Sequence, residues 1–133
     1  MDTKLLEADR VHSIVGAFFA TYNYFGYGLA ESVYAGALAV ELDARGHRVA
    51  REVAIDVQYR GVHVAWQRLD LVVDRKVIVE LKASEKLPPF AERQLMNYLR
   101  ASSFEVGLLL HCGPKPAFRR YIDFPKTKRG SEQ

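Results

Sequence analysis

One stretch decides the fold: Arg68-Leu-Asp70-Leu-Val-Val-Asp-Arg-Lys-Val-Ile-Val-Glu80-Leu-Lys82. Apolar residues alternate with polar ones on either side of Asp74-Arg75-Lys76, which predicts two antiparallel strands joined by a three-residue loop. The alternation predicts an apolar face made by Leu69, Leu71, Val73, Val77, Val79 and Leu81. It predicts an opposite face made by Arg68, Asp70, Val72, Ile78, Glu80 and Lys82.

The loop length also sets the register of this hairpin. Pairing Val73 with Val77 places Asp70 opposite Glu80, and a slip of one residue would turn one apolar set to the wrong face. Directly opposed side chains have Cβ atoms about 4.5–5.5 Å apart, so the two carboxylates would repel each other without a cation. Two carboxylates with water and a substrate phosphate suit Mg²⁺. Lys82, on the same face, could orient or deprotonate an attacking water or stabilise charge on the phosphate.

The same stretch has a simpler interpretation. Asp, Glu and Lys often alternate with core residues on a strand face that is merely solvated. The stretch by itself leaves both interpretations open.

Outward from this hairpin, the hydrophobic period predicts the remaining elements. Before it we expect helices at about 5–22 and 30–44, a loop at 22–28 between them, and a strand at 49–59 that turns at Arg60-Gly61. After it, Pro88-Pro89 opens a helix at about 90–101, and strands are expected at 105–111 and, at a sheet edge, 121–124. This order predicts an α/β (α+β) domain with a mixed central sheet flanked by helices.

Several short motifs resemble a known family. Asp70 with Glu80-Leu-Lys82 resembles the D…ExK signature of PD-(D/E)XK nucleases, and Gly28-Leu-Ala-Glu31-Ser-Val-Tyr34 is similar to the GxxExxY motif of a small bacterial family in that superfamily. Similar segments follow in the expected order, namely Arg68-Leu-Asp70, Glu80-Leu-Lys82-Ala83, Gln94-Leu-Met-Asn97-Tyr98-Leu99 and Gly107-Leu-Leu-Leu-His-Cys-Gly113. The resemblance covers about 26–120 and implies a restriction-endonuclease-like fold with the order ααβββαβ(β).

The resemblance also implies an activity and its residues. It implies a Mg²⁺-dependent nuclease, with Mn²⁺ as a substitute, that hydrolyses phosphodiesters of DNA rather than RNA. The metal ligands would be Asp70, Glu80, the Leu81 carbonyl and Glu31, the last often through water. The catalytic residues would be Asp70, Glu80, Lys82 and Glu31, and the substrate-binding residues Gln94, Tyr98 and Arg68.

Each supporting residue has a plain alternative. Glu31 is also a first-turn glutamate favoured by the helix dipole. Gln94 and Tyr98, four residues apart on one helix face, also fit a packing tyrosine beside a surface glutamine. Arg68 and Arg119 also fit solvated arginines, and Trp66, a candidate for base stacking, also fits a packing tryptophan.

Composition restricts the wider function. The 133 residues suit one domain, predicted at 1–125, and the net charge of +3 arises in a C-terminal segment that leads into a basic tail at 126–133. Such a tail attracts phosphate backbones, although basic termini also serve solubility.

The single cysteine, Cys112, is expected to be a buried, inert thiol. Without a signal peptide or a long apolar run, we expect a cytoplasmic protein.

Other classes of function have less support. The four histidines show no zinc-ligand spacing, and no GxxxxGK[ST] loop is present. A serine triad stays open as an alternative, although the chain has no GxSxG elbow. The main alternative is a catalytically silent nucleic-acid-binding or protein-interaction module with the same fold. A chain this short would gain specificity from a homodimer or from a larger repair or defence complex.

Overall fold

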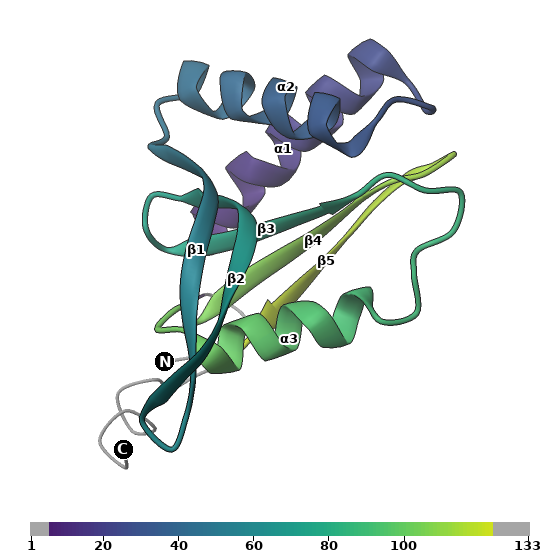
Figure 1. The fold of residues 1–133 in the computed structure, drawn as a ribbon. Coiled ribbons are helices and arrows are strands. Elements are labelled where there is room, and N and C mark those ends of the chain that lie inside the picture. The colour runs from purple at the N-terminus through teal and green to yellow at the C-terminus, as the bar shows by residue number, and fades with distance from the viewer. Residues whose placement is uncertain (1–5, 124–133) are drawn as a thin grey trace.

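The computed structural model describes residues 6–123. Within this range the helices are α1 (Ala8–Phe25), α2 (Glu31–Ala44) and α3 (Ala91–Ala101), and the strands are β1 (Val49–Tyr59), β2 (Val62–Val73), β3 (Val77–Lys82), β4 (Val106–Cys112) and β5 (Pro116–Ile122). The five strands form one sheet in the order β1-β2-β3-β4-β5 (Figure 1). Only the β3–β4 pair among these neighbours is parallel, so the predicted mixed sheet is confirmed.

Helices cover both faces of the sheet. Helices α1 and α2 lie on one side and α3 on the other, as Figure 1 shows. Ile14, Phe18 and Leu38 are among the helix residues that bury Val79 and Leu108. The α3 side has its own apolar cluster, which contains Leu95, Leu99, Ile78, Val72 and Leu109. Strands β3 and β4 are therefore apolar on both faces, as buried strands beside a parallel crossover are expected to be.

The first helix ends later than predicted. It continues to Phe25 because Tyr22 remains buried and its hydroxyl donates a hydrogen bond to the Gly113 carbonyl. Gly26, whose φ is 73°, then ends the helix, and its N–H donates to the Tyr22 carbonyl at 2.7 Å. The predicted loop is consequently confined to the residues between Phe25 and Glu31.

The last strand begins earlier than predicted. Strand β5 pairs with β4 from the Cys112↔Pro116 pair onward, because the chain reverses within a short turn after Gly113. Position 124 of the predicted strand and the basic tail at 126–133 lie outside the described residues, and the single domain at 1–125 stays a prediction.

The β1–β2 hairpin extends beyond the rest of the sheet. Arg60 and Gly61, with φ 53° and 79°, form its turn, as predicted. Strand β2 pairs with β3 only over Leu71, Val72 and Val73, so most of the hairpin is a two-stranded arm that passes α3 (Figure 1).

Two further expectations concern burial. Cys112 is fully buried, as predicted, and this burial raises the pKa of its thiol to about 12, which disfavours the reactive thiolate. No helix among residues 6–123 is both long enough and apolar enough to cross a bilayer.

Candidate active site

Strands β2 and β3 separate at Asp70. Their ladder contains the predicted pairs Val73↔Val77 and Leu71↔Val79 and ends there. Beyond it, the Asp70 N–H donates to Glu80 Oε1 at 2.9 Å, and the Leu81 N–H donates to Asp70 Oδ2 at 2.8 Å. Two carboxylates thus accept the backbone N–H groups that would otherwise pair across the two strands, and they lie side by side between the strands.

Two details of the predicted register are wrong. Asp70 and Glu80 are neighbours through their side chains rather than as backbone partners. Leu69 was expected to face Leu81, but it packs with Val72 and Ile78 in the cluster on the α3 side. The reason is that β2 twists away from β3, and Glu52 on β1 adopts a left-handed conformation with φ 50°.

Glu80 is the most deeply buried acid of this pair. It is 5% exposed. Burial and, to a smaller extent, the neighbouring Asp70 carboxylate raise the pKa of Glu80 to about 8, although the Asp70 N–H and Lys82 oppose the rise. A buried carboxyl beside a second carboxylate retains its proton near neutral pH unless a cation compensates its charge.

Lys82 lies against α3 on the predicted face. Its Nζ donates to Gln94 Oε1 at 3.1 Å and is 5.9 Å from the centroid of the Phe90 ring. The Tyr98 hydroxyl donates to Gln67 Oε1 at 3.4 Å. Burial raises the pKa of Tyr98, and so do the nearby carboxylates of Glu80 and Asp70. Gln94 and Tyr98 therefore share the helix face that borders the carboxylates.

Glu31 reaches the same region from the opposite layer. Burial raises its pKa, Asp70 raises it further, and Lys82 and a hydrogen bond from the Ala83 N–H oppose the rise. Glu31 and Asp70 line one cavity of about 280 Å³. The other residues that line it are Ser32, Ala35, Arg51 and Glu52.

The start of α2 holds Glu31 in place. Gly28 has φ 112°, a conformation that side-chain-bearing residues rarely adopt. Tyr34, only 2% exposed, donates its hydroxyl to the Gly26 carbonyl and accepts the Leu29 N–H at 3.4 Å. The glycine and the tyrosine thus shape the loop that delivers Glu31 to the carboxylates.

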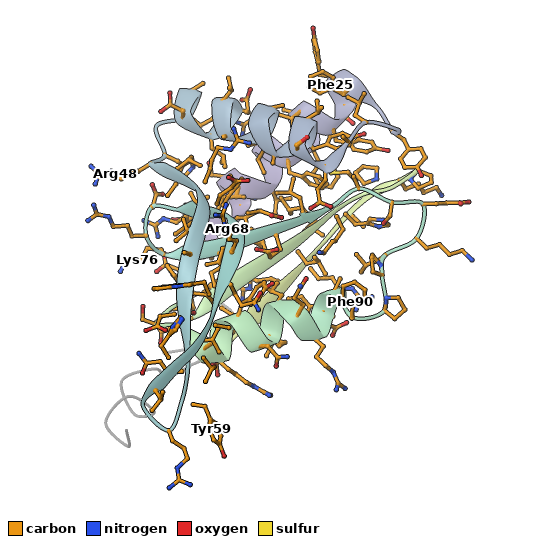
Figure 2. All side chains as sticks on the ribbon, viewed as in Figure 1. Phe25, Arg48, Tyr59, Arg68, Lys76 and Phe90 are labelled. Carbon is orange, nitrogen blue, oxygen red and sulfur yellow. The ribbon has the colours of Figure 1, made fainter. Side chains whose placement is uncertain are left out.

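Three candidates lie apart from the carboxylates. Arg68, labelled in Figure 2, is exposed, and its Nη1 lies 3.7 Å from Glu52 Oε2. Arg119 lies 3.7 Å from Glu92 of α3. Trp66 is 64% exposed on the hairpin arm, where its ring is 4.8 Å from that of His63, so it is not the packing tryptophan of the alternative.

A metal centre here would need oxygen ligands beyond side-chain carboxylates. Among residues 6–123 there is no group of three or more His, Cys, Asp or Glu side chains placed to hold a metal ion. The Asp70–Glu80 pair nevertheless supplies hard oxygen donors, which fit Mg²⁺ because that ion usually keeps several waters and uses one or two carboxylates.

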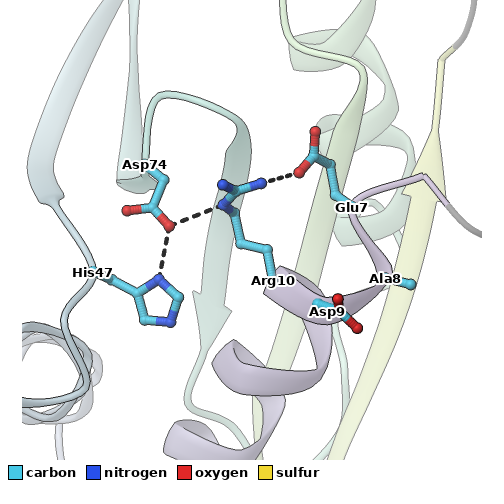
Figure 3. A pocket seen from close by; sticks show the side chains of 6 residues that line it. All are labelled: Glu7, Ala8, Asp9, Arg10, His47 and Asp74. Carbon is cyan, nitrogen blue, oxygen red and sulfur yellow. Dashed lines mark hydrogen bonds and ion pairs between the residues drawn. The ribbon is translucent and has the colours of Figure 1, made fainter.

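The turn of the β2–β3 hairpin is held by a separate polar network (Figure 3). Asp74 Oδ2 contacts His47 Nδ1 at 2.7 Å and Arg10 Nε at 2.9 Å, while Asp74 Oδ1 accepts the Arg48 N–H at 2.8 Å. Partial burial opposes ionisation, but these hydrogen bonds outweigh it and lower the pKa of Asp74 to about 2. Asp74 and Arg75 have φ 54° and 57°, the left-handed pair that a tight hairpin turn requires.

This network also contains the connectivity of a serine triad. Ser13 Oγ lies 2.7 Å from His47 Nε2, and His47 Nδ1 contacts Asp74. However, Ser13 lies beyond the first turn of α1, where backbone N–H groups are bonded within the helix. The N–H groups of this part of α1 are therefore not available to bind an oxyanion, and the network ties α1, the segment after α2 and the β2–β3 turn together.

Comparison with known proteins agrees with this geometry. The family model described as "PD-(D/E)XK nuclease superfamily" matches residues 8–121. The chain belongs to that superfamily. The match spans every helix and almost every strand residue described above, so the superfamily assignment made from the D…ExK motif is confirmed.

One solved structure supports the fold of this superfamily member. The structure described as "Crystal structure of SSO0001" matches with a TM-score of 0.56 and 23% identity. The match covers 77% of this chain and 56% of that chain, so this chain spans little more than half of its length. No curated protein matches.

Three residues near the site were not singled out from the sequence. Glu52 faces Asp70 across the hairpin only because a bulge between Val57 and Gln58 shifts the register by one residue. Phe90 and Gln67 approach Lys82 and Tyr98 through the packing of α3 on the hairpin. Only the QxxxY spacing of Gln94 and Tyr98 indicated that this helix face borders the site.

Proposed function

We propose that this chain is a metal-dependent phosphodiesterase that hydrolyses nucleic acid, DNA in preference to RNA. The observation that carries the proposal is a pair of hydrogen bonds where β2 leaves β3, one from the Asp70 N–H to the Glu80 carboxylate and one from the Leu81 N–H to the Asp70 carboxylate. These bonds hold two carboxylates together in a partly buried position beside Lys82. Such an arrangement is costly in charge repulsion and is typical of a site built for a cation.

The cation we propose is Mg²⁺, with Mn²⁺ as a substitute. Asp70 and Glu80 would hold it, together with the carbonyl of Leu81. In a strand the N–H and C=O of one residue point to the same side, and the Leu81 N–H points to Asp70, so its carbonyl points into the same gap. Glu31 would support the cation through water. When bound, the cation would polarise the phosphate and lower the pKa of a water molecule.

The chain's own residues then have separate roles. Lys82, held by Gln94, would orient the attacking water or stabilise negative charge that develops on the phosphate oxygens. Gln94 and Tyr98 would position the substrate strand, and Arg68 would contact a phosphate further along the hairpin.

We also propose membership of the GxxExxY family. Its motif residues here have distinct physical tasks, since Gly28 permits the loop, Tyr34 fixes it and Glu31 is delivered to Asp70. A chain of this size would gain sequence recognition from a homodimer or from a larger repair or defence complex.

The test is cleavage of labelled single-stranded, duplex and branched DNA with Mg²⁺ or Mn²⁺. The Asp70→Ala/Glu80→Ala double variant is expected to cut nothing, whereas the matched control Asp43→Ala/Glu85→Ala, two exposed acids that do not line the cavity beside Asp70, is expected to cut like the wild type. Metal-dependent cutting that survives in the first variant would refute the assignment. No cutting by the wild type, with no metal binding by calorimetry, would favour the silent binding module.

A further inference from the structure

A second cavity lies beside the carboxylates, between α3 and the β1–β2 hairpin. Its volume is about 370 Å³, within the range of cavities that hold small organic groups. The residues that line it are Val57, Gln67, Phe90, Arg93, Gln94, Asn97, Tyr98 and Ala101. None of these is acidic and one is an arginine, so the cavity suits part of an anionic ligand.

The cavity is linked to the proposed catalytic lysine through a shared residue, Gln94. Gln94 lines it and accepts a hydrogen bond from Lys82 Nζ at 3.1 Å. Tyr98 lines it too, and its hydroxyl bonds across to Gln67 of β2 at 3.4 Å. A substrate strand whose phosphate lies at Lys82 therefore has its adjoining nucleotide at this cavity.

Phe90 gives the cavity a flat apolar surface. The ring is 60% exposed at the start of α3, although it lies only 5.9 Å from the charged Nζ of Lys82. Exposed aromatic rings along a basic path are the platforms on which single-stranded bases stack. At the rim, Gln67 and Asn97 add amide groups that both donate and accept hydrogen bonds, as the edges of nucleobases require.

We infer that this cavity binds one unpaired nucleobase of the substrate strand, stacked on Phe90 and bonded at its edge by Asn97 or Gln67. The inference rests on the proposed function and specifies its substrate class. A base that enters the cavity has left its complementary strand. The preferred substrates are consequently single strands, flaps and frayed ends rather than continuous duplex.

The test measures binding without cleavage. A short fluorescent thymidine oligonucleotide is titrated with the full chain in Ca²⁺, and a single abasic residue is then moved through each position of the oligonucleotide. The wild type, Phe90→Leu and the control Phe118→Leu, a half-exposed ring on β5, are compared. Leucine retains apolar bulk at position 90 but removes the aromatic face.

The inference predicts coupling between base and ring. One abasic position weakens binding to the wild type and to Phe118→Leu by about fivefold or more, the low end for a base stacked on an aromatic ring. Phe90→Leu is expected to bind the intact oligonucleotide about fivefold or more weakly than the wild type does. The abasic residue is then expected to weaken its binding no further. Equal abasic losses in all three proteins, or no sensitive position, would overturn the inference.

Two further readouts separate this inference from the proposed function. Cutting with Mg²⁺ but without base coupling leaves the nuclease standing and removes the base cavity. Coupling without cutting would support the base cavity and remove the nuclease. If Phe90→Leu instead changes the sedimentation of the protein alone, the cavity holds a second copy of this chain and the inference is wrong.

Discussion

Glu80 links the stability of the protein to its proposed activity. Its folded-state pKa of about 8 lies above the ordinary value of 4.5, so the folded chain retains a proton that the unfolded chain releases. The folded state therefore loses stability as the pH rises from about 4.5 to about 8, and below 4.5 the carboxyl imposes no charge penalty.

Glu80→Gln is expected to stabilise the metal-free protein. The amide oxygen can still accept the Asp70 N–H, while the charge is removed. In EDTA the gain in unfolding free energy should be on the order of 4 kcal/mol at pH 8 and should vanish near pH 4.5. Urea denaturation at both pH values measures it, with Glu85→Gln, an exposed acid, as the control. An equal effect of Glu80→Gln at both pH values would show that the negative charge of Glu80 does not destabilise the folded protein.

Tyr34 and Gly28 show how single residues position Glu31. Tyr34→Phe removes the hydroxyl that bonds the Gly26 carbonyl and the Leu29 N–H. We expect a loss of about 1 kcal/mol in stability and a lower kcat with little change in KM, because Glu31 is displaced. Tyr27→Phe, an exposed tyrosine, is the control, and equal kinetics in both variants would contradict this positioning role.

At the scale of elements, the turn between β2 and β3 fixes the register that brings Asp70 and Glu80 together. Asp74 bonds His47, Arg10 and the Arg48 N–H, and its own N–H donates to the Arg48 carbonyl at 2.7 Å. These bonds hold the turn in the one geometry that pairs Val73 with Val77 and so brings Asp70 beside Glu80.

Asp74→Asn is expected to destabilise the protein in a pH-dependent manner. Asparagine tolerates the left-handed backbone, so the change removes mainly the charge. Because the folded pKa of about 2 lies below the ordinary 3.8, the stabilisation is present above pH 3.8 and is lost as the pH falls through 2. Urea unfolding should show a loss of roughly 2 kcal/mol at pH 7 and little near pH 2. An equal loss by the control Asp43→Asn would contradict the account.

Most elements could be predicted from the sequence, since their hydrophobic period is carried by local residues. Alternation and proline placement alone predict the start of β3, the Asp74 turn and helix α3. The side that Leu69 faces could not be predicted, because it depends on where β2 leaves β3 and on the bulge between Val57 and Gln58. Local alternation contains no signal for either feature.

The candidate site was predictable only in part for the same reason. Asp70, Glu80 and Lys82 belong to one hairpin, so their proximity follows from its register. Phe90 and Gln67 meet them only through the packing of α3 on a distant strand, which a single sequence does not specify.

At the scale of the whole molecule, the site forms where the sheet opens. Strand β2 leaves β3, and this allows α2 from one layer and α3 from the other to reach the same two carboxylates. Figure 1 shows the hairpin arm passing α3 as it leaves the sheet. The two cavities, one beside Asp70 and Glu31 and one beside Phe90, lie at this opening.

Hydrogen exchange should reflect this architecture. Amides of β3 and β4, buried on both faces, are expected to exchange slowest, and those at the Arg60-Gly61 end of the arm fastest. Adding a single-stranded oligonucleotide in Ca²⁺ should slow exchange in α3 and in the adjoining part of β2, but not in α1. Protection spread evenly over the chain, or confined to α1, would contradict the placement of the substrate.

Asp70 and Glu80 are expected to hold one divalent cation between them. Titration calorimetry of Mg²⁺ into the wild type and Glu80→Gln at pH 7, in buffers of different ionisation enthalpy, tests it most directly. The account predicts one site in the wild type, with release of up to about one proton because Glu80 must ionise, and no binding in the variant. The same heat in both proteins, or binding without proton release, would contradict it.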